Sequence, residues 1–315
     1  MTQITFRPAR RPMTPLTIGI AGPTKGGKTY SALLLAQGLT KRSGKPIVMI
    51  NAGEGAKGHQ YADQIDYLTA DLVPPYSPKR YTEHLKAALD VDPGVVIIDS
   101  ATHMHEGTGG VLDYHEQELD RLAGDDRSRR EKMNFAAWAK PKQEESQFIY
   151  ALLEAGCHVV LCFRSKEKIK LKGGKVIDLG WQPIASDRLT FETAFTLMLP
   201  PRCKGVPDLS LSDLRSPYDE MIKPGQAISA DLGVALDEWA QGDNAPKTIS
   251  RQQQTTLGGI IRDRGLTVEQ AQQIVYDVAG VTASAQIPAD KYGAVETTLL
   301  AAEGVEPEHM QEALA

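Results

Sequence analysis

A glycine-rich segment at residues 22–29 limits the folds that this chain of 315 residues can adopt. Its sequence, GPTKGGKT, matches the pattern G-x-x-x-x-G-K-[S/T] at every fixed position. A short apolar run at residues 16–21 precedes it, and a helical pattern of leucines begins at Lys28. In such a place, glycines let consecutive backbone N–H groups point at phosphate oxygens beside a helix N-terminus. The segment therefore predicts a strand, a phosphate-binding loop and a helix in succession.

The residues of this loop have expected roles in binding ATP and Mg²⁺. Lys28 is expected to contact the β- and γ-phosphates, and the hydroxyl of Thr29 to bind the metal. The other positions expected to contact the nucleotide are Gly22, Pro23, Thr24, Lys25, Gly26, Gly27 and Tyr30. Because Lys25 lies in the middle of the loop, the loop variant with a second lysine near its start is not favoured.

A P-loop also needs an acidic residue near the metal, normally at the end of a neighbouring hydrophobic strand. Asp99 directly follows the apolar run at residues 95–98, so it is the expected partner of Thr29 at Mg²⁺. An ordinary polar residue at a strand end is the plain alternative, and the presence of the P-loop weakens it.

Hydrolysis requires a further group that orients the attacking water. Glu54 follows the second expected strand, at the sheet edge where parallel α/β proteins bind ligands, and is the candidate. Arg164, after the fourth expected strand, and Asp187 and Arg188, before the fifth, are candidates to sense the γ-phosphate or to act on a neighbouring subunit. Ordinary surface charges are the alternative for each of them.

Apolar strands alternate with helical patterns along most of the chain. The strands are expected at residues 16–21, 46–50, 95–98, 157–163 and 191–199. This alternation is typical of an α/β fold in which helices cover both faces of a mostly parallel sheet. A turn-rich stretch at 242–246 interrupts it, and helical patterns follow. We expect an N-terminal arm (1–14), a P-loop domain (15–240), a linker (241–249) and an acidic helical domain (250–315).

Composition and charge narrow the class of protein. With 41% hydrophobic and 24% charged residues, the chain is typical of globular proteins. No apolar run approaches the roughly 18 residues of a membrane span, and no signal peptide is evident, so we expect a cytoplasmic protein without a membrane partner. Three cysteines are too few for a disulfide framework. From Ser250 onward, nine acidic residues face four basic ones, which accounts for the whole net charge of −5.

Cations alternate with other residues in the segment after the fourth expected strand. Arg164, Lys166, Lys168, Lys170 and Lys172 are spaced two apart, which places them on one face of an extended strand. Glycines at 173 and 174 permit a tight reversal into a strand that begins at Lys175, so a β-hairpin is predicted. Its five lysines are candidates to bind a DNA backbone. Protection of an exposed strand edge explains them equally well, and aromatic residues for base stacking are few, with Phe163 and Trp181 nearby.

Two other clusters have plainer explanations. The spacing of His103, His105 and Glu106, even with His59 or His115, fixes no third metal ligand, so a nucleotide-sensing loop is favoured over a metal site. Arg127, Arg129 and Arg130 lie in a polar stretch and are interpreted as part of a mobile loop.

Together these segments resemble phage-encoded RecA-like, AAA-type ATPases of recombination and single-strand-annealing modules. The resemblance covers about residues 15–240, and it is carried by the P-loop and by residues 99–110, 164–166 and 179–183. It implies a RecA-like core, ATP and Mg²⁺ as ligands, single-stranded DNA as partner, and a ring or filament of identical subunits. The chain departs from the family at the second strand, where Asn51 and a displaced Glu54 replace an acidic residue followed by glutamate.

The expected function is thus a DNA-dependent ATPase of recombination or annealing. One alternative is a nucleotide-regulated switch with little turnover, which Asn51 favours; another is a small-molecule kinase, disfavoured because no arginine-rich lid is evident. The acidic C-terminal domain could recruit a single-strand-binding or replication protein, or shield the basic hairpin, and the sequence leaves both open.

Overall fold

The structure, a computed structural model, describes residues 11–172, 175–242, 249 and 251–302. The side chains of residues 56–57, 169–172, 175–179 and 251 lie outside this description. Contacts divide the chain into two compact units, Met1–Asp243 and Asn244–Ala315.

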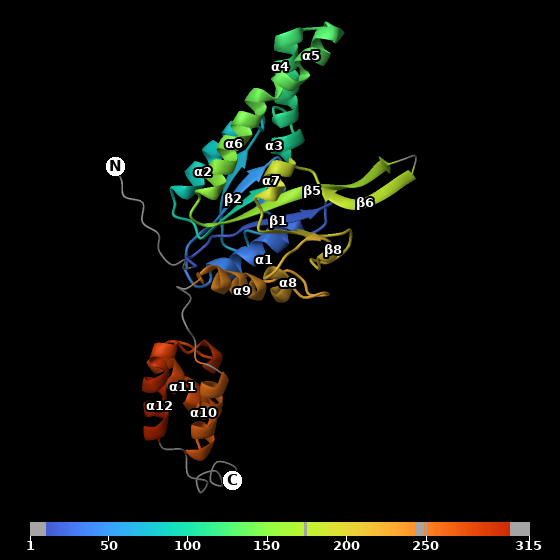
Figure 1. Cartoon of the computed structure of the whole chain (residues 1–315). Helices are drawn as coiled ribbons and strands as arrows, with labels where there is room; N and C mark the ends of the chain where they lie inside the picture. The colour runs from blue at the N-terminus through green and yellow to red at the C-terminus, as the bar shows by residue number, and fades with distance from the viewer. Residues whose placement is uncertain (1–10, 173–174, 243–248, 250, 303–315) are drawn as a thin grey trace, which may run out of the picture. The chain divides into compact units, whose positions relative to one another are not determined.

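A mostly parallel sheet forms the middle of the first unit (Figure 1). Its strand order is β3-β2-β4-β5-β1-β7-β8, and every neighbouring pair is parallel except β7 with β8. Outside this order, β6 pairs antiparallel with β5. The strands are β1 (Thr17–Gly22), β2 (Ile47–Ala52), β3 (Leu68–Leu72), β4 (Val95–Asp99), β5 (His158–Lys172), β6 (Lys175–Pro183), β7 (Phe195–Met198) and β8 (Asp208–Asp213). The predicted α/β fold is confirmed.

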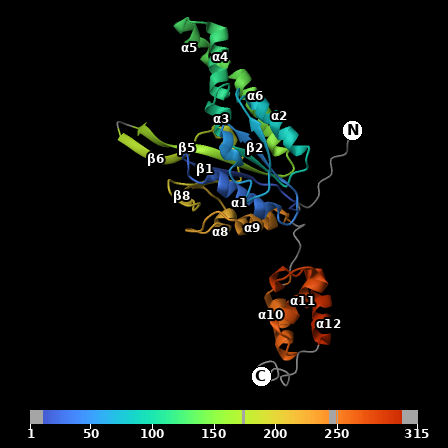
Figure 2. The ribbon, with the colours of Figure 1, turned by 180° about the vertical axis from the view of Figure 1, so that it is seen from behind.

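Helices cover both faces of the sheet, as the two opposite views show (Figures 1 and 2). α1 (Lys28–Thr40) and α9 (Ala230–Ala240) pack on one face, and α2 (Pro78–Leu89) and α6 (Ala139–Leu153) on the other. Alternation along the strands separates the two cores: in β4, Val95 and Ile97 join the core of α1, and Val96 and Ile98 join that of α2. Burial on both faces explains why these strands are continuous apolar runs.

Two glycines let α1 and α9 cross closely. A Cβ atom on Gly38 would lie 1.9 Å from the carbonyl oxygen of Ala230, and one on Gly233 would lie 2.2 Å from that of Leu35. The chain before β1 also reaches α9, because Thr14 N–H donates to the carbonyl of Ala240 at 2.8 Å.

The segment between β4 and β5 forms helices, of which α4 and α5 extend away from the sheet (Figure 1). These are α3 (Thr102–Glu106), α4 (Val111–Ala123) and α5 (Arg127–Ala137), followed by α6. The interpretation of residues 127–130 as a mobile loop is wrong, because Asp126 caps α5 by accepting the N–H of Arg129 at 3.1 Å. Within the helical pair, Arg130 forms ion pairs with Glu116 and Asp120.

The remaining elements of the first unit are short. They are η1 (Gly55–His59), α7 (Asp187–Phe191) and α8 (Tyr218–Met221). The strand expected from residue 191 begins at Phe195, because Ser186 caps α7 and makes residues 187–191 helical.

The second unit is a small helical domain with its own core. It contains α10 (Arg251–Asp263), α11 (Val268–Ala279), η3 (Ser284–Gln286), η4 (Ala289–Lys291) and α12 (Tyr292–Ala301). Leu257, Val275, Val295 and Leu299 are buried among these helices. Within the part of the chain that the structure describes, no helix is both long and apolar enough to cross a membrane.

Candidate nucleotide-binding site

The glycine-rich loop connects β1 to α1, as the sequence predicts. Gly27, the residue before the helix, has φ +87°, a left-handed conformation that glycine adopts without strain. The ammonium group of Lys28 donates to the carbonyl oxygens of Gly22 at 3.0 Å and Pro23 at 2.9 Å. The lysine thus lies folded over the loop, where its positive charge can reach phosphates bound by the loop.

Thr29 and Asp99 meet beside the loop. The hydroxyl of Thr29 donates to Oδ2 of Asp99 at 2.5 Å, although β5 lies between β1, which leads to Thr29, and β4, which ends at Asp99. Asp99 is 2% exposed; burial raises the pKa of its carboxyl group, while the hydrogen bond from Thr29 and the charge of Lys28 oppose this. A carboxylate and a hydroxyl fit Mg²⁺, which prefers oxygen ligands and is usually held by few protein groups together with substrate phosphates.

Glu54 and Arg164 form an ion pair at the same edge of the sheet. Nη2 of Arg164 lies 2.7 Å from Oε1 of Glu54, and Nε lies 3.3 Å from it. In the strand register, Arg164 is the partner of Gly22, which explains how it reaches the P-loop. His103 Nε2 lies 3.9 Å from the same carboxylate oxygen; burial, and then the charge of Arg164, lower the pKa of His103. Glu54 and Arg164 were each expected near the γ-phosphate, and the structure places the two side chains in contact.

Asn51 holds the turn that carries Glu54. Its amide group donates to the carbonyl of Gly55 at 2.8 Å and to Oδ1 of Asp71 at 2.6 Å. His59 contacts the same oxygen at 3.2 Å, and the hydrogen bond from Asn51, followed by that from His59, lowers the pKa of Asp71. An aspartate at position 51 could not donate to these acceptors. The departure at the second strand thus has a structural reason.

The P-loop, Asp99 and the Glu54–Arg164 pair line a pocket of about 330 Å³. It is bounded by residues 24–29, Glu54, Gln60, Tyr61, Asp99 and Arg164. A second pocket of about 510 Å³ shares residues 25–27 and Tyr61 with it and adds Tyr30, Leu34 and residues 202–205. The rings of Tyr30 and Tyr61 are 5.1 Å apart. Tyr61 and Cys203 were not predicted, because no local motif marks loops that reach the site through the fold.

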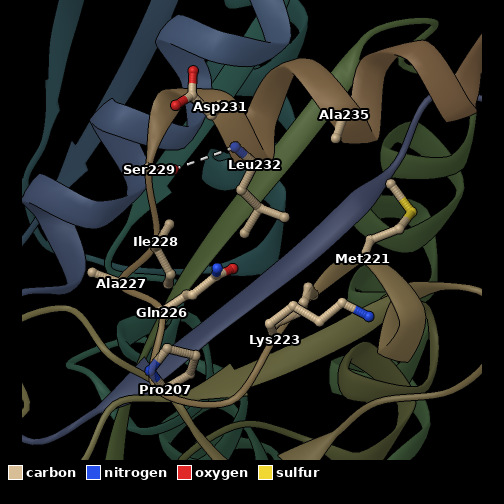
Figure 3. A pocket seen from close by; sticks show the side chains of 11 residues that line it. Pro207, Met221, Lys223, Gln226, Ala227, Ile228, Ser229, Asp231, Leu232 and Ala235 are labelled. Carbon is tan, nitrogen blue, oxygen red and sulfur yellow. Dashed lines mark hydrogen bonds between the residues drawn. The ribbon is translucent and has the colours of Figure 1, made fainter.

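A third pocket, of about 460 Å³, lies between the segment before α9 and the helix itself (Figure 3). It shares Ala227 and Ile228 with the pocket of Tyr30. Ser229 in its wall caps α9 by accepting the N–H of Leu232 at 3.3 Å, so this hydroxyl has a structural role.

Several expected site residues lie elsewhere. Arg188 donates to the carbonyl of Lys142 at 3.0 Å and to Oγ of Ser146 at 2.7 Å, so it fastens α7 to α6. Asp187 is the first residue of α7, outside the residues that line the nucleotide pocket. His115 stacks on Trp138 with the rings 4.0 Å apart. Among the described residues, no cluster of three or more His, Cys, Asp or Glu side chains could hold a metal ion.

The predicted basic hairpin is present in the backbone and projects from the sheet (Figure 1). β5 and β6 pair with Lys166 opposite Gln182 and Lys172 opposite Lys175. The register shifts once, near Gly180, where β6 has one extra residue and φ is +65°. Lys166 and Lys168 are exposed, while the side chains of Lys170, Lys172 and Lys175 lie outside the described part.

The chain was compared with family models, curated proteins and solved structures, and the family model agrees with the P-loop assignment. No curated protein matches the chain. Among solved structures, a KaiC-like protein from the archaeon Pyrococcus horikoshii is similar, with 14% identity, a TM-score of 0.32, and coverage of 61% of this chain and 81% of that chain. A family model described as an AAA domain matches residues 14–200, which contain the P-loop, Glu54, Asp99 and Arg164. The chain therefore belongs to the AAA domain family, whose P-loop binds a nucleotide.

Proposed function

We propose that this protein is a DNA-dependent ATPase that converts ATP to ADP and phosphate. The observation that carries the proposal is the convergence of Lys28, the Thr29–Asp99 pair and the Glu54–Arg164 pair on one pocket. Phosphoryl transfer to water requires charge neutralisation, a metal position and a carboxylate near the γ-phosphate.

Binding of ATP replaces protein contacts with phosphate contacts. Lys28 exchanges its two carbonyl acceptors for the β- and γ-phosphates, and backbone N–H groups of the loop bind the phosphate oxygens. Thr29 and Asp99 are the residues that would hold Mg²⁺, which would supply charge neutralisation at the phosphates. The base lies in the neighbouring pocket against Tyr30 and Tyr61.

Glu54 orients the water that attacks the γ-phosphorus and accepts its proton, and the bond to the β–γ bridging oxygen breaks. While Arg164 holds Glu54, this carboxylate points at a guanidinium. The γ-phosphate competes for the same guanidinium, so its arrival frees Glu54 for the water and leaves Arg164 to neutralise charge in the transition state.

The exposed lysines of the hairpin support single-stranded DNA as the polymer partner, because cations at regular spacing suit a phosphate backbone. The recombination or annealing role, the phage source and the assembly of identical subunits into a ring or filament rest on the sequence resemblance. The helical C-terminal domain is the proposed contact for a single-strand-binding or replication protein.

A second candidate is a nucleotide-regulated switch with little turnover. The ion pair between Glu54 and Arg164 favours it, because a carboxylate bound to an arginine does not orient water. In this case ATP changes the shape of the protein and hydrolysis serves mainly to reset it.

Steady-state ATP hydrolysis with and without single-stranded DNA tests these alternatives. Stimulation by DNA supports the ATPase, and tight ATP binding without turnover supports the switch. Phosphoryl transfer to a small acceptor would identify a kinase and contradict both.

Cysteine alkylation tests the position of the base. Cys157 and Cys162 are buried, and burial raises the pKa of both thiols, that of Cys157 to about 11. Cys203 is partly exposed in the wall of the proposed base pocket. ATP is expected to slow alkylation of Cys203 more than inorganic triphosphate does, whereas equal protection would place the base elsewhere.

A further inference from the structure

A small pocket lies at the base of the hairpin, where β5 and β6 leave the sheet. It has a volume of about 240 Å³ and is lined by residues of β5, β6, α7, β7 and β8, among them Lys168, Phe191 and Asp213. This is below the roughly 300–1,000 Å³ of sites for drug-sized ligands, and it suits a single ring system.

Of the phenylalanines that the structure describes, Phe135 and Phe191 are exposed, and of these two only Phe191 lines this pocket. Phe148, Phe163 and Phe195 are at most 1% exposed, whereas Phe191 is 77% exposed at the end of α7. An aromatic ring that is exposed at a pocket is a surface on which another ring can stack.

The short helix α7 holds this ring in place. Leu189, two residues earlier, is 1% exposed in the core, and Ser186 caps the helix by accepting its N–H at 3.2 Å. Arg188 is bound to the carbonyl of Lys142 and the hydroxyl of Ser146 on α6. Leu189 in the core and Arg188 on α6 therefore anchor the segment that presents Phe191 to solvent. Because the segment is already fixed, less conformational entropy is lost when a base stacks on the ring.

Charges around the pocket distinguish a base from a phosphate as its occupant. Asp187 and Asp213 are among the lining residues, and Oδ1 of Asp213 also lies 3.5 Å from Nε of Arg215. Carboxylates repel a phosphate and accept hydrogen bonds from base N–H groups. Lys168 in the lining and Lys166, two residues before it on β5, are both exposed and can contact phosphates on either side of an inserted base.

We propose that this pocket binds one nucleobase of single-stranded DNA, stacked on Phe191, while Lys166 and Lys168 contact the adjoining phosphates. The inference rests on the proposed function, since it takes the hairpin to be the DNA-binding element. It adds the aromatic contact that single-strand-binding surfaces combine with cations, supplied by a residue outside the hairpin.

Binding of labelled oligodeoxycytidine and of an abasic strand of equal length tests this proposal, in the presence of ATP and Mg²⁺. Phe191→Ala is expected to weaken binding of oligodeoxycytidine about 5- to 150-fold, the range that corresponds to one stacked base. Binding of the abasic strand, which has the same phosphates, is expected to stay unchanged. Phe191→Trp is expected to retain affinity for oligodeoxycytidine, because it retains an aromatic ring.

Phe135→Ala is the matched control, since Phe135 is 87% exposed on α5, away from the pocket lining. It is expected to bind both strands as the unsubstituted protein does. Equal binding of oligodeoxycytidine by folded Phe191→Ala and by the unsubstituted protein would overturn the base pocket while leaving DNA binding intact. Failure of the unsubstituted protein to bind either strand would overturn the DNA-dependent function together with the pocket.

Discussion

Arg164 and Glu54 form an ion pair inside the nucleotide pocket, with Nη2 of the guanidinium 2.7 Å from Oε1 of the carboxylate. The two residues are 110 positions apart in the chain; Arg164 lies within β5, and Glu54 follows β2. Both side chains are largely shielded from water, with exposed fractions of 34% for Arg164 and 14% for Glu54. Under the proposed function, this pair controls whether Glu54 is available to a water molecule.

Glu54→Gln is expected to reduce ATP turnover at least ~10²-fold, the scale of a lost general base, and to leave ATP bound. The amide keeps the shape of the side chain but cannot accept the proton of the water. Steady-state hydrolysis and equilibrium binding of ATP measure the two effects. Unchanged turnover would place the water-orienting role on another residue.

Lys28→Ala is expected to weaken ATP binding about 10- to 150-fold, since it removes a charged hydrogen bond donor from the phosphates. Lys25→Ala, in the same loop, is the control and is expected to have a smaller effect because the Lys25 side chain is exposed. Titration with a fluorescent ATP analogue measures both. An equal loss of ATP affinity in the two variants would argue that positive charge anywhere in the loop, rather than the position of Lys28, binds the phosphates.

Asp99→Asn is expected to weaken ATP binding more with Mg²⁺ than in EDTA. The substitution removes the negative charge that attracts the metal and retains a side chain that accepts a hydrogen bond from Thr29. The same titration with and without metal measures the difference. An identical loss under both conditions would contradict a metal role for Asp99.

Gly38→Ala is expected to lower the free energy of unfolding of the first unit by roughly 1–3 kcal/mol, the usual cost of overpacking. The added methyl group would overlap the carbonyl oxygen of Ala230 and separate α1 from α9. Gly258→Ala in α10 meets no atom within 4 Å, so the better helix propensity of alanine is expected to raise stability. Urea denaturation measures the free energy of unfolding of both variants. An unchanged value for Gly38→Ala would show that α1 and α9 are free to move apart.

Asp237 is expected to make the first unit sensitive to acid. Burial alone would raise the pKa of Asp237, but His158, whose Nε2 lies 3.5 Å from Oδ1, and hydrogen bonds from Arg42 lower it to about 2. Because this value lies below the ordinary pKa, the carboxylate stabilises the fold above about pH 4, and this contribution is lost as the pH falls toward 2. The contribution is about 2 kcal/mol at neutral pH, at ~1.4 kcal/mol per pKa unit.

Asp237→Asn removes that contribution. The stability difference between the unsubstituted protein and the variant is expected to be largest at neutral pH and to shrink below about pH 4, as measured by urea denaturation across this range. A difference that does not change with pH would exclude ionisation of Asp237 as its source.

Local pattern predicted much of this protein. The P-loop, Asp99 at the end of β4, the alternation of strands and helices and the basic hairpin all depend on residues that are neighbours in the chain. Backbone conformation and the direction of successive side chains follow from such short segments. The exposed strand β3 was missed because its residues, four of five of them exposed, show no apolar run.

Contacts between distant segments were decided by the tertiary structure. The sequence placed Glu54 and Arg164 at the same sheet edge, but their ion pair depends on the strand order that brings β2, β4, β5 and β1 together. The position of Tyr61 and Cys203 beside the P-loop, and of Phe191 beside Lys168, likewise depends on how loops pack after the sheet has formed. No short-range pattern encodes these distances, because they result from the packing of the whole core rather than from the conformation of any one segment.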